Sequence, residues 1–435
     1  MSIDRRTLLK LLAASTIAAP WPALASHSAL APADESLLDD MERRGCLYFA
    51  EQASPNTGQV LDRARWPNST GKLDSRRMAS IAATGFGLSA LCIADKRGYQ
   101  PHAQILEQVR RTLRFHANTL PNDHGFFVHF NDLETGAPWR NSELSSIDTS
   151  LLLCGILTAR AHFHRDDEIV HLATTIYERV DWPWMLNGER TFSMGMRNGK
   201  FLAARWNHYC ELMLLYLLAI GSPTHPIDPI SWEAWSRPLI HYAGANYIGA
   251  ADPLFVHQYS HAWFDFRNKS DRHADYFANS ILATRAHQAF CLSLGKPYSA
   301  DYWGISSSDS QHGYTAWGGP GVRDPGAPDN PQGYGGIDGS VVPYATAGSL
   351  PFLPTDCLRV LHSLRDRYSK YAWGRYGFCD AFHPDAQWYD PDVLGIDLGI
   401  SVLMAENLRS DFVWDTFARN HEVPIAMQRA GFHNV

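Results

Sequence analysis

The sequence predicts an all-α protein built as a closed α/α double barrel, and three observations support this fold class. Apolar residues recur with helical spacing over most of the chain, whereas strand signals are few and short. Some helical runs are apolar almost all round and others have one charged face, as an inner and an outer ring of helices require. No sequence period repeats along the chain, which argues against a solenoid.

Residues 1–25 are predicted to be an export signal and not part of the fold. Arg5 and Arg6 precede a short apolar stretch, and the sequence ALA supplies small residues for cleavage. The run DRRTLLK resembles a twin-arginine signal, which implies passage through the export machinery to the bacterial periplasm. The alternatives are an ordinary secretory signal or a retained anchor, but the apolar stretch is shorter than a membrane span. Residues 26–435 are expected to form a single catalytic domain without a stable membrane span.

The composition narrows the classes of function. The formal net charge is −7 and the isoelectric point is about 6.3, which argues against a nucleic-acid partner because such a surface is basic. The seven cysteines are an odd number without a CxxC pair or metal-ligand spacing. Those expected as buried free thiols in apolar helices are Cys92, Cys154, Cys210 and Cys291. Fourteen tryptophans favour a protein that stacks aromatic rings on sugars.

Start and stop signals bound several of the predicted helices. Ser145 and Ser146 precede one apolar run, and Gly221 follows another. Helices are expected at 36–53, 76–96, 102–118, 145–164, 168–179, 206–220, 229–243, 272–294, 355–370 and 396–420, the last of which can be two helices. The runs apolar on nearly every side, expected in the inner ring, are 79–94, 147–159 and 206–220. The runs with one charged face, expected in the outer ring, are 102–118, 168–179 and 355–370.

The segment from Gly304 to Pro354 is rich in glycine and proline and contains no predicted helix. Long connections of this kind are usually functional or disordered. Disorder is not expected because the segment carries several aromatic residues, among them Trp317, Tyr334 and Tyr344. We expect an ordered wall over one mouth of the barrel.

Glu211 is a single carboxylate in the run RWNHYCELMLLYLLAIG, which is predicted to be one continuous apolar helix. A carboxylate in such a helix must be paired, protonated or exposed to a wet cavity, since an unpaired buried charge is costly. In the middle of a helix it has no capping role. One hypothesis is therefore a general acid whose pKa is raised by desolvation. The other is a buried ion pair with an arginine such as Arg63 or Arg267.

Three further carboxylates stand at or before the starts of apolar helices. Glu143 and Asp148 occur in NSELSSIDTSLLLCG, and Asp397 occurs in VLGIDLGISVLMAEN. Acids at the entry turns of inner helices converge on one end of a barrel, where two carboxyls in different environments can serve as acid and base. The structural alternative for Asp148 and Asp397 is a helix cap or a first-turn charge that the helix dipole favours.

The stretch FVHQYSHAWFDFRNKSDRHADYFANS alternates hydrogen-bonding and aromatic side chains just before a long predicted helix. This mixture is typical of sites that bind the hydroxyl groups of a sugar and stack on its apolar face. An aromatic-rich capped loop is the structural alternative. The candidates in this stretch are His257, Gln258, His261, Trp263, Asp265 and Arg267.

Motifs for nucleotide binding, nucleophile elbows and zinc proteases are missing from the sequence. His162 and His164 come nearest to a metal-binding pair, but they occur at the polar end of a helix beside Arg165 and are expected on the surface. The sequence therefore offers no candidate metal ligands and no cofactor site.

Several blocks, taken in order, resemble the glycoamylase-like domain. This grouping includes the bacterial β-1,2-glucanases of glycoside hydrolase family 144 and a domain of cyclic β-1,2-glucan synthases. The blocks are RWNHYCELMLLYLLAIGSPTHP, VHQYSHAWFDFR with DYFANSILATRA, WGISSSDSQHGY, VVPYATAGSLPFLP, RYGFCDAF and GIDLGISVLMAENLRS. The resemblance extends from about Leu38 to about Arg419. It implies an (α/α)6 barrel, in agreement with the helix pattern, and hydrolysis of β-1,2-linked glucan without a metal or an organic cofactor.

The family's acidic positions fall by motif on Glu143, Asp148 and Glu211, and Asp397 matches a further acid. We expect Glu211 to protonate the glycosidic oxygen and Glu143 to activate water, directly or through a substrate hydroxyl, with inversion favoured. Asp148 and Asp397 are expected to position water and sugar. Residues expected to stack on glucose rings are Trp206, Tyr209, Trp263 and Trp317. Residues expected to bind hydroxyl groups are Arg63, Gln258, His261, Asp265 and Arg267.

The segment RDPGAPDNPQGYGGIDG is longer and richer in proline than the family pattern leads us to expect. Product length and even linkage therefore stay open. We expect a periplasmic β-1,2-glucanase, endo-acting or sophorose-releasing, whose substrate is a glucan oligosaccharide or polysaccharide. The alternatives are a glucan transglycosylase, a hydrolase of another glucan linkage, and a non-catalytic glucan-binding envelope protein. The presence of all four acids favours catalysis over binding alone.

Overall fold

The computed structural model describes residues 30–65, 70–250, 253–320 and 337–435, so the export signal predicted for residues 1–25 lies outside the described part. The α-helices are α2 (Pro32–Glu51), α3 (Ile81–Arg97), α4 (His102–Asn118), α5 (Ser146–His162), α6 (Asp167–Glu178), α7 (Trp182–Leu186), α8 (Met213–Gly221), α9 (Tyr276–Ser293), α10 (Pro343–Ala347), α11 (Pro354–Ala372), α12 (Gly395–Ser410), α13 (Phe412–Phe417) and α14 (Glu422–Arg429). The 3-10 helices are η1 (Pro229–Glu233), η2 (Leu254–His257) and η3 (Tyr259–Ala262).

The strands are short, and most pair two by two. They are β1 (Arg63–Arg65), β2 (Met78–Ser80), β3 (Asn122–Asp123), β4 (Phe126–Val128), β5 (Phe130–Asp132), β6 (Leu144–Ser145), β7 (Phe192–Ser193), β8 (Gly195–Arg197), β9 (Lys200–Phe201), β10 (Arg205–Trp206), β11 (Leu239–Tyr242), β12 (Ala245–Ile248), β13 (Lys269–Ser270), β14 (Ser307–Ser310), β15 (Gly313–Ala316), β16 (Trp373–Gly374), β17 (Gly377–Phe378), β18 (Phe382–His383), β19 (Trp388–Tyr389), β20 (Asp392–Leu394) and β21 (His433–Asn434). The largest sheet has the order β3-β4-β6-β8-β9, and its strands are antiparallel. The strands are as short as predicted but more numerous.

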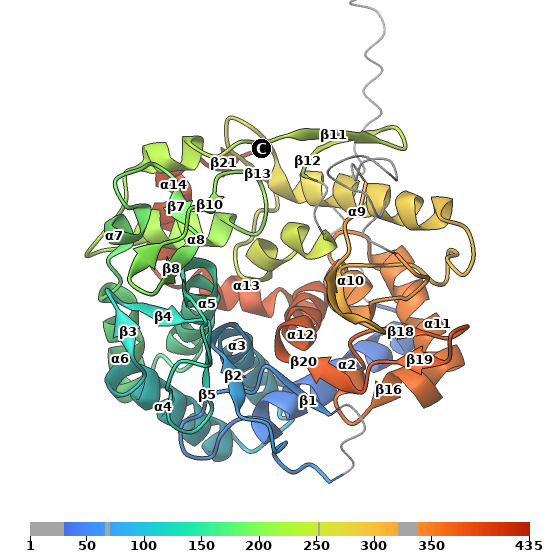
Figure 1. The fold of residues 1–435 in the computed structure, drawn as a ribbon, viewed down its shortest axis with the longest axis horizontal. Coiled ribbons are helices and arrows are strands. Elements are labelled where there is room, and N and C mark those ends of the chain that lie inside the picture. The colour runs from blue at the N-terminus through green and yellow to red at the C-terminus, as the bar shows by residue number, and fades with distance from the viewer. Residues whose placement is uncertain (1–29, 66–69, 251–252, 321–336) are drawn as a thin grey trace, which may run out of the picture.

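The helices form two concentric rings, which confirms the predicted α/α barrel (Figure 1). In the inner ring, α3 packs on α5 and on α12, α5 packs on α8, and α12 also packs on α10 and on η3. The outer helices α2, α4, α6, α11 and α14 contact the inner ring or one another, and α9 packs on η2. Every residue of α8 is buried, whereas α4 buries one face. The two kinds of helical run in the sequence therefore correspond to the two rings.

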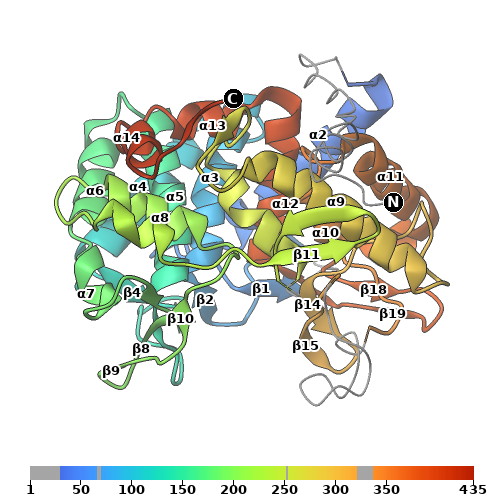
Figure 2. The ribbon, with the colours of Figure 1, turned by 90° about the horizontal axis from the view of Figure 1, so that it is seen from above.

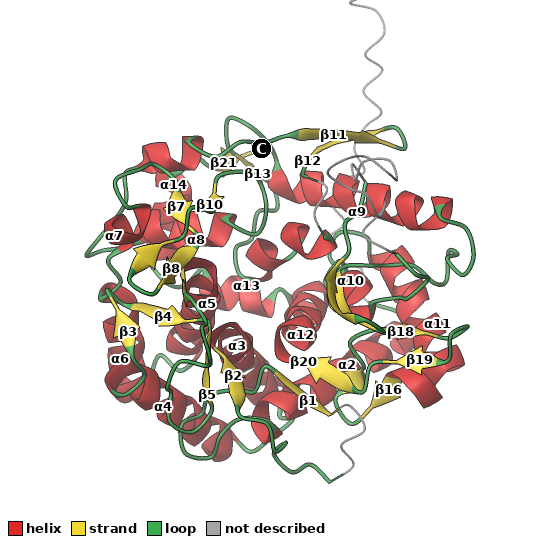
Figure 3. Cartoon of the chain, viewed as in Figure 1, coloured by secondary structure: helices red, strands yellow, loops and turns green. Residues whose placement is uncertain are grey.

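Many of the strands, coloured yellow in Figure 3, gather at one end of the barrel. Figure 2 shows β1, β2, β8, β9, β14, β15, β18 and β19 at that end, with α13 and α14 at the other. Strand β2 leads directly into α3, β6 into α5 and β20 into α12. The inner helices α3, α5 and α12 therefore all begin at the strand-bearing end, which positions their first turns beside one another.

Two predicted helices are wrong in part. The run 206–220 becomes helical only at Met213, because the preceding backbone bonds to a distant segment: Tyr209 N–H donates to Ser236 O, and Ser236 N–H donates to Asn207 O. The run 229–243 forms η1 and then β11, because Pro238 removes a backbone donor and disfavours the helical conformation before it.

The structure also shows the ends of two predicted helices and the state of the cysteines. The predicted start at Ser145 is confirmed, and the run 396–420 breaks at Asp411, which adopts a left-handed conformation with φ 57°. The seven cysteines are all free and buried. Among the described residues, no helix has both the length and the apolar character needed to cross a membrane.

The glycine-rich and proline-rich segment is only partly described. The hairpin β14–β15 and helix α10 belong to it, so the expectation that it contains no helix is wrong. Residues 321–336 lie outside the described part. The predicted wall over the barrel mouth therefore stays a prediction.

Close packing of α3 on α5 depends on two glycines. A Cβ atom on Gly155 would overlap the main-chain oxygen of Gly85, and one on Gly85 would overlap Leu151 O. These helix backbones approach more closely than any side chain allows.

We expect Gly155→Ala to lower the free energy of unfolding by about 2–3 kcal/mol, because the added methyl must push the two backbones apart. Urea unfolding measures this change. Ser150→Ala, in the same helix, serves as the control because it removes only a local bond to Ser146 O. Equal stability of Gly155→Ala and wild type would contradict the observed packing.

Candidate active site

The strand-bearing end of the barrel carries the predicted acids Asp148 and Asp397 in the first turns of α5 and α12. Ser145 caps α5 by accepting from Asp148 N–H at 3.2 Å, and its hydroxyl donates to Asp148 Oδ2 at 2.5 Å. The first-turn position of Asp148 is therefore partly structural. Both helices also direct their positive ends toward this region, which stabilises carboxylates there.

His129 connects two of the predicted acids. Its Nδ1 lies 3.1 Å from Glu143 Oε1, and its Nε2 lies 3.4 Å from Asp148 Oδ1. Glu143 Oε2 accepts a hydrogen bond from Arg197 at 2.8 Å. The bond to His129, reinforced by Arg197, lowers the pKa of Glu143 to about 2. Glu143 is therefore ionised at physiological pH and is a weak proton acceptor.

Stability is expected to depend on pH through His129. Burial alone would lower the pKa of its imidazole, but Asp148 and Glu143 outweigh burial and raise that pKa. The protonated ring therefore stabilises the fold fully below the unfolded pKa of about 6.5, and this contribution is lost as pH rises through the higher folded pKa. We expect His129→Gln to lower the free energy of unfolding most at about pH 5–6. Urea unfolding at a series of pH values tests this, and a deficit that stays constant up to alkaline pH would contradict it.

Arg63, a predicted sugar ligand in β1, lies at the same end. Its Nε donates to Asp62 Oδ2 at 3.0 Å, and its Nη1 pairs with Asp309. The side chain is 25% exposed. Arg63 therefore shares its one positive charge between two carboxylates, and its contact with a sugar stays a prediction.

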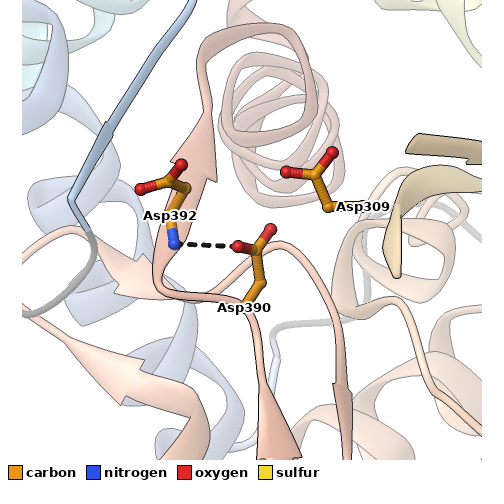
Figure 4. A group of neighbouring side chains, drawn as sticks. All are labelled: Asp309, Asp390 and Asp392. Carbon is orange, nitrogen blue, oxygen red and sulfur yellow. Dashed lines mark hydrogen bonds between the residues drawn. The ribbon is translucent and has the colours of Figure 1, made fainter. Parts of the chain in front are cut away.

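Asp309, Asp390 and Asp392 form a group of three carboxylates, with one oxygen of each within 4.8 Å of the others (Figure 4). Arg63 pairs with Asp309, and Arg76 binds both oxygens of Asp392 at 2.7 Å. Burial and the neighbouring aspartates raise the pKa of Asp390 to about 9. Arg76 and the proton on Asp390 thus offset two of the three carboxylates, and Asp309 shares the charge of Arg63 with Asp62.

Asp397 is buried beside a second carboxyl, Asp380, which the sequence reasoning missed. Burial raises the pKa of Asp397 to about 7, and a hydrogen bond with Asp380 limits the rise. Burial and the charge of Asp397 raise the pKa of Asp380 well above its usual range. Tyr259 OH donates to Asp397 Oδ1 over 3.4 Å. Asp397 therefore titrates near neutral pH, where a carboxyl can serve as an acid or a base.

Glu211 lies in a turn before α8 and is half-buried, so the prediction that a continuous helix encloses it is wrong. Its main-chain oxygen accepts from Ser260 Oγ at 2.7 Å. The pKa of Tyr259 is raised by burial, by Asp397 and, more weakly, by the charge of Glu211. Tyr259 thus contacts Asp397 directly and is reached by the charge of Glu211, whose main-chain oxygen bonds to the adjacent residue Ser260.

The predicted stacking residues near Glu211 are largely enclosed. Trp206 is 9% exposed, and its Nε1 donates to Ser146 Oγ at 2.9 Å, at the start of α5. Tyr209 is buried with its hydroxyl 3.2 Å from His257 Nδ1, and Trp317 is buried as well. These rings help to build the acid-bearing end, and their stacking on glucose stays a prediction.

Gln258, His261 and Trp263, which were predicted to contact sugar, are core residues, and that contact stays a prediction. All three are at most 1% exposed. Gln258 Nε2 donates to Ala345 O at 2.9 Å, His261 Nε2 lies 3.1 Å from Ser280 Oγ, and Trp263 Nε1 donates to a serine hydroxyl in α3. Their polar atoms bond to residues of the helices α10, α9 and α3, because the segment runs through the barrel interior.

Asp265 and Arg267, which were predicted to bind sugar hydroxyl groups, lie at the other end of the barrel from Asp397. Arg267 Nη1 donates to Asp411 Oδ1 at 2.8 Å, and the guanidinium lies 4.1 Å from the centre of the Trp414 ring. Asp411 follows the last turn of α12, whereas Asp397 is in the first, a separation of about 20 Å along the helix. The 3-10 segment carries the chain from one end of the barrel toward the other, which local sequence does not reveal.

Sequence reasoning also missed several charged groups at the strand-bearing end. They are Asp62, His129, Asp309, Asp380, Asp390 and Asp392. One signal was available: the run YDPDVLGID places two closely spaced acids directly before the inner helix that carries Asp397.

Known proteins resemble this chain over most of its length. An exo β-1,2-glucooligosaccharide sophorohydrolase (non-reducing end) of Parabacteroides distasonis is 26% identical over 449 residues, which cover 91% of this chain and 58% of the relative. The chain thus spans about 58% of that relative's length. The solved endo-β-1,2-glucanase of Chitinophaga pinensis, in complex with sophorotriose and glucose, superposes with a TM-score of 0.81 at 25% identity, covering 93% of this chain and 99% of that one.

A second solved structure, a β-1,2-glucanase of Parabacteroides distasonis, has the same fold: its TM-score is 0.79 at 22% identity, with coverage of 94% of this chain and 61% of that one. The model of the Glycoamylase (glucoamylase) family matches residues 203–421, half of the chain. The matched segment runs from just before β10 to just before α14 and includes Glu211 and Asp397. By this match, and with the two-ring helical barrel that accompanies it, the chain belongs to the Glycoamylase family.

Proposed function

We propose that this protein is a glycoside hydrolase that cleaves β-1,2-linked glucan. The observation that supports the proposal is that Asp397, in the first turn of α12, and the turn that holds Glu211 bond to the adjacent residues Tyr259 and Ser260. Hydrolysis of a glycosidic bond needs two carboxyls with different tasks. The similarity to a sophorohydrolase and to an endo-β-1,2-glucanase supports glucan with this linkage as the substrate.

In the proposed reaction, Glu211 donates a proton to the glycosidic oxygen as the bond from the anomeric carbon to that oxygen breaks. Water forms the new bond to the anomeric carbon and gives its proton to Asp397, directly or through a substrate hydroxyl. Asp397 is better suited to this role than Glu143, which was expected to fill it. His129 and Arg197 already occupy the Glu143 carboxylate and hold its pKa at about 2.

The remaining groups at this end hold the site together. His129 contacts both Glu143 and Asp148 at the start of α5, and the Arg63 guanidinium pairs with Asp62 and Asp309. We propose that Arg63 and Trp206 contact the bound glucan. Residues 1–25 are proposed to direct the protein to the bacterial periplasm through the twin-arginine machinery, which places it where envelope glucans occur.

Chromatography of the products tests this function. The purified protein is incubated with linear β-1,2-, β-1,3-, β-1,4- and α-1,4-glucans. We expect only the β-1,2-glucan to shorten, with a matching gain of reducing ends. Shortening of another glucan would reassign the linkage, lengthened chains without new reducing ends would indicate transglycosylation, and no change in any glucan would contradict catalysis.

A further inference from the structure

Asp380 is a buried carboxyl to which the reaction proposed above assigns no task. It follows β17 and is 4% exposed. Its Oδ2 accepts the main-chain N–H of Asp309 at 2.9 Å. Its Oδ1 and Asp397 Oδ2 are both buried, and within the described ranges neither accepts a hydrogen bond from an N–H group or a hydroxyl. The Asp380 carboxyl instead faces Asp397 within hydrogen-bonding contact.

Two carboxyls in such contact must share a proton. An ionised carboxylate has only acceptor oxygens, so a hydrogen bond between the pair requires one member to be protonated. Two ionised carboxylates at this separation in a buried site would repel each other strongly. The remaining question is which of the two carries the proton.

The surroundings favour the proton on Asp380. Asp397 is close to the Arg63 guanidinium and receives the Tyr259 hydroxyl, and both stabilise its ionised form. Asp380 instead has one such partner, the main-chain N–H of Asp309, and the nearby carboxylate of Asp309 acts against it.

The other groups around the pair do not change this assignment. Asp62 raises the pKa of Asp397, and the Arg63 guanidinium, which pairs with Asp62, acts in the opposite direction. The weakly acidic neighbours Tyr259 on η3, Tyr344 on α10 and Cys379 are buried, and burial raises the pKa of each above its usual range. These three groups stay neutral at physiological pH, and the Arg63 guanidinium favours the ionised form of Asp397.

We propose that Asp380 is a positioning residue that carries a proton and donates it as a hydrogen bond to Asp397, so that Asp397 is held ionised and oriented toward the reacting water. This inference rests on the proton-acceptor role proposed above for Asp397. Without the donated hydrogen bond, burial would keep Asp397 protonated to higher pH, and fewer molecules would be ready to accept a proton from water.

Two substitutions of Asp380 separate its possible roles. In Asp380→Asn, the amide oxygen can accept the Asp309 N–H while the amide nitrogen donates to Asp397, as the protonated acid does. In Asp380→Val, the branched side chain fills the space but offers no donor. An apolar side chain that fills the space is needed because a cavity of about 20 Å³ adjoins Asp380 and Asp397, large enough to admit one water molecule that could replace the donor.

The test measures kcat/KM on β-1,2-glucan against pH for wild type and both variants. The acidic limb of this profile reports ionisation of the proton acceptor in the free enzyme. We expect Asp380→Asn to keep the acidic limb near its wild-type position, and Asp380→Val to move it upward by about one pH unit or more. A structural role alone would lower stability without moving the limb.

A second measurement needs only wild type and Asp380→Asn. Their infrared difference spectrum at neutral pH isolates one carboxyl, and we expect wild type to show the carbonyl stretch of a protonated carboxyl that the variant lacks. This readout tests the proton on Asp380 even when Asp380→Val does not fold.

Three results would overturn the inference. The first is a downward shift of the acidic limb in Asp380→Asn, because it would show that Asp380 is normally charged. The others are an acidic limb at the same pH in all three proteins and an infrared difference spectrum without the band of a protonated carboxyl. An inactive wild type would instead defeat the proposed function, and the infrared result would still decide the protonation of Asp380.

Discussion

Glu211→Gln is expected to lower kcat on β-1,2-glucan by about 10²–10⁴-fold while the fold is retained, because the amide cannot protonate the departing oxygen. Glutamine has nearly the same shape as glutamate, and the hydrogen bond from Ser260 reaches the main-chain oxygen of Glu211, which the substitution leaves in place. The loss should therefore appear in kcat with little change in thermal midpoint. Release of reducing ends and a thermal unfolding curve measure the two quantities.

Glu107→Gln provides the matched control because Glu107 lies on the exposed face of the outer helix α4. It makes the same chemical change far from the strand-bearing end and should leave turnover unaltered. If Glu211 were instead a structural ion pair, Glu211→Gln would lower the thermal midpoint markedly and leave substantial turnover. That pattern would remove Glu211 from the proposed reaction.

Asp397→Asn is expected to cause a loss of similar size, about 10²–10⁴-fold in kcat/KM, because the variant has no group in the same place to receive the proton of water. The amide oxygen can still accept from Tyr259, so the start of α12 should keep its structure. The wild-type profile should show an acidic limb near pH 7, where burial and Asp380 set the pKa of Asp397.

Asp385→Asn is the corresponding control, since Asp385 is exposed in the loop between β18 and β19. Turnover by Asp397→Asn within a factor of a few of wild type would leave Glu143 as the acceptor, as the sequence first suggested. Glu143→Gln would then show the larger loss, which makes the two assignments distinguishable by one set of assays.

The ring architecture could be predicted from the sequence because it follows from local periodicity. The segments that form α3, α5 and α12 are apolar on nearly every side, so their composition alone predicts that they are buried. Ser145 marks a helix start because its side chain caps the helix. The start of α8 could not be predicted in this way. Residues 207–209 bond to the backbone near Ser236, and a local pattern does not show a partner nearly thirty positions away.

The site was predictable only where an acid stood at a helix entrance. Asp148 and Asp397 met that condition, whereas Asp380 and Asp309 sit in or next to short strands whose positions depend on the closure of the barrel. Arg267 illustrates a residue that the sequence made a candidate for the site but that lies elsewhere. It is close in sequence to Gln258 and has several hydrogen-bond donors, yet it bonds to Asp411 at the far end of α12.

The most direct test of the central claim uses an aryl β-glycoside of a β-1,2-glucooligosaccharide, whose leaving group departs without a proton. We expect Glu211→Gln to turn over this substrate at a rate near that of wild type although it fails on glucan, because only its proton-donating step is missing. Asp397→Asn should fail on both substrates, because attack by water still needs a proton acceptor. Rescue of Asp397→Asn by the aryl glycoside, or failure of Glu211→Gln on it, would contradict the assignment of acid and base on which the proposed mechanism depends.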